Sequence, residues 1–179
     1  MLTLSILAFI LLIGLLTKTI AQNGEEVRIS PKAVVEQTVG LTDITIEYSR
    51  PGVKGRTIWG GLVPYNVVWR AGANEATKFT FEKEVKINGK KLTSGSYSFF
   101  AIPTKNSWII IFNKVADQWG AFEYNDTEDA LRIEVEPEEN DDSWEEWLAY
   151  SFTKTSDKTA VVRLEWERLK VPFTVEVGI

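Results

Sequence analysis

Apolar and polar residues alternate along most of the chain from residue 43 onward. This period of two is typical of half-buried β-strands. In the segment TAVVRLEWE (159–167), every second residue from Ala160 to Trp166 is apolar, and Arg163 and Glu165 lie between them. No helical apolar period is sustained over the rest of the chain after the first 21 residues. The pattern predicts an all-β protein, with helix limited to a turn or two near 33–36 or 144–146.

Turn residues divide this pattern into about ten short strands. Asn88-Gly89 supplies the positive φ angles that a two-residue hairpin requires, and Ser94-Gly95 and Pro103 to Asn106 mark two further turns, so that 77–113 is expected to form a meander. The continuous apolar run in SWIIIFN (107–113) predicts a central strand buried on both faces. Strands are expected over 43–49, 77–87, 96–102, 107–113, 130–136, 147–152, 159–167 and 171–177. The expected fold is an antiparallel β-sandwich, with a barrel-like arrangement as the alternative.

The first 21 residues have the order of a secretory signal peptide. They are apolar from Leu2 to Leu16, become polar at Thr17 and end in Thr19-Ile20-Ala21. The apolar run is shorter than the ~20 residues that a membrane-spanning helix needs, so cleavage after Ala21 is expected rather than retention as a membrane anchor. We therefore expect a secreted or periplasmic protein with one all-β domain at residues 22–179 and no stable membrane insertion after cleavage.

The composition narrows the chemistry that is open to this chain. It contains no His and no Cys, which excludes Ser-His-Asp and Cys-His catalysis and removes the usual ligands of zinc and non-haem iron. An enzyme would have to use carboxylates, Lys, Tyr or Arg, and no cofactor is expected. The formal net charge is −5, and loss of Lys18 with the signal peptide makes it −6. This charge argues against nucleic acid as a partner.

The segment from Tyr48 to Thr77 has the composition of a binding surface. Its basic residues are accompanied by one acid, Glu75, and are interleaved with aromatic residues and glycines. Aromatic rings beside Arg and Asn donors suit a polar, flat ligand such as a sugar or a short peptide. The candidate ligand-binding residues are Arg50, Arg56, Trp59, Tyr65, Trp69, Arg70, Asn74 and Glu75. The alternative is structural: the glycines form turns, the tryptophans lie in the core, and Arg70 pairs with Glu75.

Five stretches of the chain, in order, resemble a family of secreted bacterial proteins. They are SRPGVKGR, VPYNVVWRAGANEAT, KLTSGSYSFFAIP, WIIIFNK and WG. The family is a domain of unknown function, number 2911, and the resemblance extends from about Ser30 to Val175. It implies no established activity, but it strengthens the matching positions as site candidates: Arg50, Gly52, Arg56, Tyr65, Trp69, Arg70, Gly72, Asn74 and Glu75. The chain departs from the family at Asn66, where Gly is more frequent, and this departure concerns only the local turn.

A second region, from Glu123 to Glu146, is strongly acidic. It contains twelve acids and one base, Arg132, which gives a local net charge of −11. Oxygen ligands at this density can bind Ca²⁺, with 125–129 and 140–142 as the candidate runs. Neither run has the spacing of an EF-hand loop, and a charged run is usually a solvated loop, so no metal-binding residue is assigned.

The seven tryptophans are expected to divide between core and surface. Trp108 and Trp166 lie on alternating strands and are expected in the core, whereas Trp144 and Trp147 flank two glutamates and are expected to be partly exposed. Several tryptophans on one face would form a stacking platform for glycans.

Three functional interpretations follow from the sequence. The first is a non-enzymatic domain that binds a glycan, a peptide or another small molecule through the segment 48–77. The second is a carboxylate-dependent glycan hydrolase that uses Glu75 with a second acid such as Glu47, one of which would need a raised pKa. The third is a structural or assembly protein of the cell envelope, which an exposed edge strand would favour.

Overall fold

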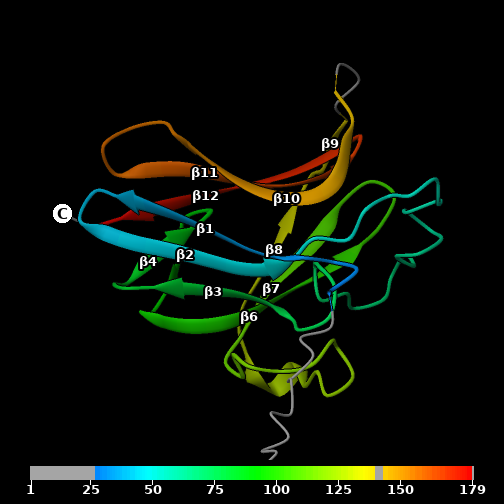
Figure 1. Ribbon diagram of the computed structural model, residues 1–179. Helices are drawn as coiled ribbons and strands as arrows, with labels where there is room; N and C mark the ends of the chain where they lie inside the picture. Colours follow the sequence, from blue (N-terminus) through cyan, green and yellow to red (C-terminus); the bar gives the residue numbers. More distant parts are fainter. Residues whose placement is uncertain (1–26, 140–142, 179) are drawn as a thin grey trace, which may run out of the picture.

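The structure, a computed structural model, describes residues 27–139 and 143–178. Its strands form two antiparallel sheets that face each other as a β-sandwich (Figure 1). Sheet I has the order β1-β2-β3-β6-β7-β8, and sheet II has the order β10-β11-β12-β4-β5, with β9 pairing to β12. Neither sheet closes on itself, so the sandwich is the correct one of the two predicted arrangements. The predicted signal peptide lies outside the described residues.

The described part contains twelve strands and one short 3₁₀ helix, η1. The strands are β1 (Lys32–Val39), β2 (Thr42–Ser49), β3 (Thr77–Phe81), β4 (Val85–Ile87), β5 (Lys90–Leu92), β6 (Gly95–Pro103), β7 (Trp108–Asn113), β8 (Asp129–Val135), β9 (Glu138–Glu139), β10 (Glu145–Lys154), β11 (Thr159–Glu167) and β12 (Leu169–Val177), and η1 is Asp126–Glu128. The sequence pattern does not predict β1 or the very short β5 and β9. The other strands begin and end within a few residues of the predicted ranges.

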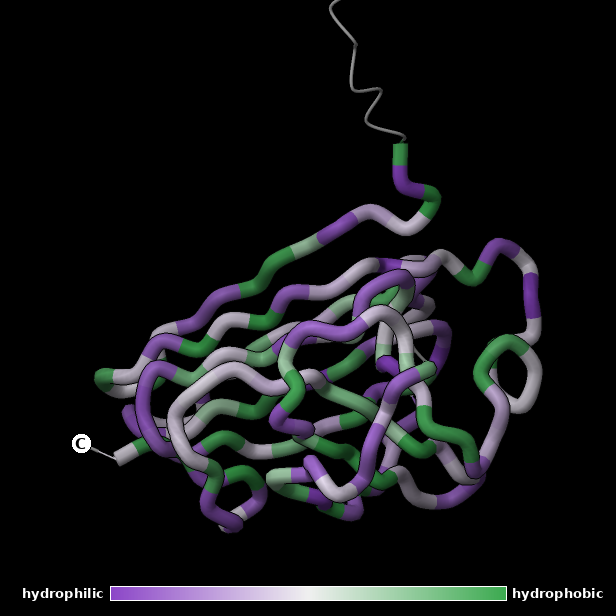
Figure 2. The backbone as a smooth tube through the Cα atoms, turned by 90° about the horizontal axis from the view of Figure 1, so that it is seen from below, coloured by the Kyte–Doolittle hydropathy of each residue, from purple (hydrophilic) through white to green (hydrophobic). Residues whose placement is uncertain are grey.

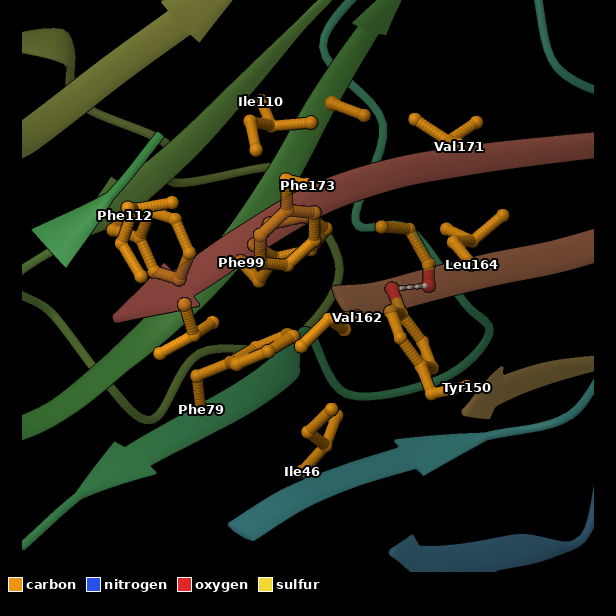
Figure 3. Packing of buried hydrophobic residues seen from close by; sticks show 14 of the residues in the cluster. Ile46, Phe79, Phe99, Ile110, Phe112, Tyr150, Val162, Leu164, Val171 and Phe173 are labelled. Carbon is orange, nitrogen blue, oxygen red and sulfur yellow. Dashed lines mark hydrogen bonds between the residues drawn. The ribbon is translucent and has the colours of Figure 1, made fainter. Parts of the chain in front are cut away.

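The hydrophobic core lies between the two sheets. On β11, alternate residues from Ala160 to Trp166 have no more than 2% of their surface exposed, as the alternation predicts. Phe79 and Phe99 of sheet I meet Phe173 of sheet II, with ring centroids 6.0 and 5.8 Å apart (Figure 3). Full burial of each of these rings stabilises the fold by about 1.5–3 kcal/mol.

The single strand predicted over 77–87 is two strands in different sheets. The charged residues 82–84 are exposed and cannot continue a buried face, so they carry the chain across the sandwich from β3 to β4. Asn88 (φ 45°) and Gly89 (φ 78°) then form the predicted hairpin with β5. The predicted meander over 77–113 is therefore wrong in part, because the β4–β5 hairpin belongs to sheet II while β3, β6 and β7 are neighbours in sheet I.

Both predicted helical turns are wrong. Residues 33–36 lie within β1, which pairs with β2 along its whole length, and the β-branched side chains of Val34 and Val35 favour a strand. Residues 145–146 begin β10, which pairs with β11.

In residues 27–139 and 143–178, no helix is long and apolar enough to cross a membrane.

Strand β7 is buried on both faces, as predicted. On one face, Trp108 and Ile110 are 1% exposed and belong to the main core. On the other face, Ile111 packs in a second apolar cluster against Ala121 and Tyr124. The segment that follows β7 therefore covers the outer side of sheet I at this point. Its residues 116–119 also line a groove beside β1 and β3 that is described below.

Candidate functional site

The connection between β2 and β3, residues 50–76, is tied to both sheets at one end of the sandwich (Figure 1). Toward sheet II, the amide of Leu148 donates a hydrogen bond to the carbonyl of Pro51 at 3.0 Å. Toward sheet I, Trp69 and Ala101 exchange both backbone hydrogen bonds at 2.8 Å. These bonds hold an irregular segment on a rigid scaffold, which is the usual setting of a binding loop.

The carbonyl group of Ala71 is a fixed point of this connection. Ala71 has φ 50°, in the left-handed region that costs an L-residue about 1–2 kcal/mol. Its oxygen accepts hydrogen bonds from the hydroxyls of Tyr150 at 2.9 Å and Thr77 at 3.0 Å (Figure 3 labels Tyr150). Burial raises the pKa of Tyr150 well above its ordinary value, so the hydroxyl keeps its proton and remains a donor. The two bonds hold the strained residue in place.

Four tryptophans form a cluster that joins the connection to both sheets. They are Trp59 and Trp69 of the connection, Trp108 of β7 and Trp166 of β11. Trp69 and Trp166 stack with centroids 6.0 Å apart and an interplanar angle of 17°, and Trp59 meets Trp108 edge-on at 4.9 Å. Trp108 and Trp166 are 1% exposed, which confirms their predicted place in the core.

A cavity of about 300 Å³, which we call the Arg70 cavity, opens beside this cluster. Its lining contains three cations and no carboxylate. The residues that matter for its chemistry are Lys54, Arg56, Trp69, Arg70, Asn74 and Trp166. The connection thus brings four of the predicted candidates, Arg56, Trp69, Arg70 and Asn74, to one site.

Two buried hydrogen-bond donors of these lining residues have no acceptor. Arg70 Nε and Trp166 Nε1 are both buried, and neither has a hydrogen-bond partner in the described part of the chain. No described carboxylate forms an ion pair with Arg70. Burial lowers the pKa of Arg70 from its ordinary value, but arginine remains protonated in proteins. Because an unpaired buried donor costs about 1–3 kcal/mol, both groups lower the stability of this part of the fold.

The other predicted polar residues of the cavity hold the backbone. Arg56 donates from Nη2 to the carbonyl of Gly52 at 2.6 Å and from Nε to the carbonyl of Val53 at 3.1 Å. Asn74 has φ 59° and donates from Nδ2 to the carbonyl of Ser30 at 3.4 Å. These acceptors are uncharged, so the positive charge of Arg56 still contributes to the potential of the cavity.

Four predicted candidates lie outside the Arg70 cavity: Arg50, Trp59, Tyr65 and Glu75. Arg50 donates from Nε to the carbonyl of Leu148 at 2.9 Å and so links the connection to sheet II. Trp59 and Tyr65 line a separate cavity of about 340 Å³. The ring of Tyr65 covers Gly60 so closely that a Cβ there would lie 2.8 Å from it. Arg50, Trp59 and Tyr65 shape the connection rather than the cavity.

Asn66 occupies a turn that needs a left-handed residue. Its φ is 62°, and its amide donates to the carbonyl of Pro103 at 2.8 Å. Asparagine tolerates this region better than most residues do. The departure from glycine at this position is therefore compatible with the turn.

Glu75, the last candidate, lies in a groove of about 350 Å³ that we call the β1–β3 groove, lined by residues of β1, β2 and β3, by Glu75 and Ala76, and by 116–119. Arg28 donates to both of its carboxylate oxygens at 2.7 Å, and Lys32 Nζ lies 3.5 Å away. The hydrogen bonds from Arg28, helped by Lys32, lower the pKa of Glu75 to about 2. Glu75 therefore pairs with Arg28 and Lys32, and the alternative pairing with Arg70 does not occur.

The remaining charges of the β1–β3 groove are also paired. Lys78 Nζ lies 3.0 Å from Glu47 and 3.3 Å from Asp117, and these carboxylates raise the pKa of Lys78. Trp119, 60% exposed, forms a backbone bridge with Glu75. The groove thus contains charges of both signs, and these charges form ion pairs with one another.

Three functional residues are absent from the predicted candidates: Lys54, Trp166 and Arg28. The alternation in β11 marks Trp166 as a core residue and gives no sign that its Nε1 lacks an acceptor. Arg28 lies 47 residues before its partner Glu75, a separation at which sequence spacing carries no information. Lys54 is visible as a basic residue of the segment, and its Nζ lies 5.4 Å from the ring centre of Trp147.

Side chains of the acidic region form hydrogen bonds within the protein. Asn125 caps η1 by accepting from the amide of Thr127 at 3.1 Å, and Asp129 accepts from Asn113 at 2.9 Å and from Tyr124 at 2.6 Å. Within the described ranges, no group of three or more acidic residues has the geometry of a metal site. The second candidate run, 140–142, lies outside those ranges.

Comparison with known proteins places the chain in a family. No curated protein and no solved structure matches it. The family described as "Protein of unknown function (DUF2911)" matches residues 30–175. This range includes all the strands of both sheets except the last two residues of β12, and every lining residue of the Arg70 cavity except Ile29. The chain therefore belongs to the DUF2911 family.

Proposed function

We propose that the protein is a non-enzymatic binding domain, and that the Arg70 cavity binds a small organic carboxylate with an apolar part. The observation that carries this proposal is a cavity lined by three cations, Lys54, Arg56 and Arg70, and by no carboxylate, in which Arg70 has no described ion-pair partner. A carboxylate is the complementary group because it only accepts hydrogen bonds, and it binds an arginine more strongly than a neutral acceptor does.

The size and walls of the cavity support a ligand of this class. A volume of about 300 Å³ is at the small end of ligand sites. The partly buried ring of Trp69, which stacks on the buried Trp166, offers apolar surface next to the charged groups. A peptide with a free C-terminus and an acidic sugar share the carboxylate, so both remain within the predicted ligand classes. A neutral glycan would leave the charge of Arg70 without a partner.

The glycan hydrolase receives less support. Its proposed acid, Glu75, has a pKa of about 2 because Arg28 holds it ionised, whereas a general acid needs a raised pKa. The second acid, Glu47, pairs with Lys78 at 3.0 Å. Both carboxylates line the β1–β3 groove, and each is engaged in an ion pair with a basic side chain.

Titration of the purified protein with benzoate and with benzamide tests the proposal. The two probes share a ring, but only benzoate carries the charge. We expect saturable binding of benzoate, followed by the fluorescence of the tryptophan cluster, and at least tenfold weaker binding of benzamide. Arg70→Met should weaken benzoate binding by about tenfold or more, since charge-assisted hydrogen bonds contribute about 1.5–3 kcal/mol.

The matched control is Arg163→Met, which removes the same charge on β11 outside the cavity, where Arg163 donates to Thr153 at 2.8 Å. This variant should bind benzoate as the unaltered protein does. Equal binding of benzoate and benzamide, or an equal loss in both arginine variants, would contradict the proposal.

We also propose that the protein acts outside the cytoplasm, in the periplasm or the medium. This proposal rests on the signal-peptide pattern of residues 1–21. The net charge of −6 expected after cleavage is the reason for proposing a small molecule, not nucleic acid, as partner. Cell fractionation combined with N-terminal sequencing tests it: a mature chain beginning at Gln22 is expected outside the cytoplasm, and an intact N-terminus in the cytosol would contradict it.

A further inference from the structure

Strand β1 lies at one margin of sheet I, and its outer edge is open. Its ladder to β2 is its only strand pairing within the described ranges. Figure 2 shows this strand, which follows the grey trace, running along the border of the molecule. An open edge of eight residues is a template for pairing with another strand.

Two hydrogen bonds determine which backbone groups of β1 point outward. The amide of Arg50 donates to the carbonyl of Pro31 at 2.9 Å, just beyond the last pair of the ladder. In an antiparallel pair, inward and outward groups alternate, so the backbone groups of Lys32, Val34, Glu36 and Thr38 face the open edge. The Gln37 side chain donates to the carbonyl of Thr38 at 2.9 Å, which agrees with this assignment.

The charges of these outward-facing residues are complementary to those of a second, identical strand that runs in the opposite direction. Lys32, Val34 and Glu36 are all exposed, with a cation and an anion placed symmetrically about a valine that is 63% exposed. We propose that β1 pairs antiparallel with β1 of a second copy, with a two-fold axis at Val34. Lys32 then faces Glu36 of the partner subunit, and the two Val34 side chains meet.

This register is the one that satisfies both the backbone and the charges. Its pairs join outward-facing residues only, as an antiparallel ladder requires. An axis at Glu36 would place two glutamates opposite each other, and an axis at Val35 would place Val34 against a charged Glu36. Like charges directly opposite are destabilising and opposite charges are stabilising. The self-complementarity favours a second copy over an unrelated strand.

Pairing would also cover apolar surface that the monomer leaves open. Ala33 and Val35 point to the core side of sheet I but are only partly buried. Joining the two sheets edge to edge would extend the core across the two-fold axis. Lys32 lies 3.5 Å from Glu75 in the monomer, but its side chain is 64% exposed and Glu75 also pairs with Arg28, so Lys32 can turn from Glu75 to Glu36 of the partner subunit.

Charge reversal tests the proposal through the mass of the purified protein in sedimentation equilibrium. The unaltered protein is expected to be a dimer, and Lys32→Glu or Glu36→Lys should each raise the dimer dissociation constant by about tenfold or more, because each turns two attractive pairs into repulsive ones. The double variant Lys32→Glu/Glu36→Lys should dimerise again. An equimolar mixture of the two single variants should form heterodimers.

The matched controls are Lys105→Glu and Glu123→Lys, which reverse charges on exposed loops away from β1 and should leave the mass unchanged. Far-UV circular dichroism confirms that each variant is folded. A monomer at concentrations up to about 1 mM, single variants that dimerise as the unaltered protein does, or a mixture that stays monomeric would overturn the proposal. These readouts do not depend on carboxylate binding, so the two proposals stand or fall separately.

Discussion

The Arg70 cavity and the β1–β3 groove are of similar size, and both are rich in charged residues. They differ in whether those charges are paired within the protein. In the groove, Glu75 pairs with Arg28, and Lys78 pairs with Glu47 and Asp117. In the cavity, no described carboxylate pairs with Arg70, and two buried donors have no acceptor. The groove contains charges of both signs, whereas the lining of the cavity contains cations only.

The difference indicates which of the two regions is prepared for a ligand. A groove whose charges neutralise one another is already satisfied and gains little from a charged partner. A cavity lined by cations without a carboxylate leaves a partly buried charge unpaired, which is unfavourable until an anion binds. Substitutions that remove a charge should therefore have opposite effects on stability in the two regions.

The largest effect is expected from removing the hydroxyl that supports the cavity. Tyr150→Phe leaves the carbonyl of Ala71 with only the Thr77 hydroxyl, and the loss of a buried hydrogen bond should lower the free energy of unfolding by about 1–3 kcal/mol. Chemical denaturation measures this change. Benzoate binding should weaken as well, because Ala71 adjoins Arg70.

Tyr97→Phe is the control for Tyr150→Phe. Its hydroxyl bonds locally with Thr93 at 2.8 Å, so its loss should reduce stability without altering benzoate binding. If Tyr150→Phe lowers stability and leaves binding intact, the hydroxyl supports the fold but not the cavity.

An intermediate effect with the opposite sign is expected from Arg70→Met. Without ligand, this variant should raise the free energy of unfolding by about 0.5–1 kcal/mol, because it replaces a partly buried, unpaired cation with an apolar side chain of similar length. Urea denaturation with and without benzoate measures both states. A destabilised Arg70→Met protein would show that the guanidinium has an internal partner and would weaken the contrast between the two regions.

The smallest effect is expected from Glu75→Gln and depends on pH. The folded pKa of Glu75, about 2, lies below the ordinary value of 4.5. Its stabilising contribution is therefore complete above about pH 4.5 and is lost as the pH falls toward 2. The contribution is modest because the carboxylate is 38% exposed.

Acid titration of the free energy of unfolding tests this pH dependence. The unaltered protein should lose stability more steeply than Glu75→Gln between about pH 4.5 and 2, and the two curves should converge at the acidic end. Parallel curves over this interval would mean that the ion pair with Arg28 does not form in solution.

Much of the sandwich could be predicted from the period of apolar residues, because successive side chains of a strand point to opposite faces of its sheet. Strand β11 is an example. The transfer of the chain between sheets at 82–84 could not be predicted in this way, since Val85 and Ile87 continue the alternation in a different sheet. Strand β1 was missed because its edge position leaves its residues half exposed and weakens the apolar signal.

The candidate site was predictable as a composition but not as a geometry. Arg56, Trp69, Arg70 and Asn74 meet in the cavity because hydrogen bonds to both sheets fold the connection back on itself. Glu75 is only five residues from Arg70, yet its backbone forms a bridge with Trp119 and its side chain lies on another surface, where Arg28 binds it. Such partners come from tertiary structure and leave no local trace in the sequence.

The pairing of β4 with β12 has a kinetic consequence. Ile87 lies opposite Val175, and Val85 lies opposite Val177, so the two halves of sheet II meet only after most of the domain has been synthesised. Contacts between residues this distant in sequence make folding slow. We therefore expect the sandwich to be completed late, after β12 has been synthesised and can pair with β4.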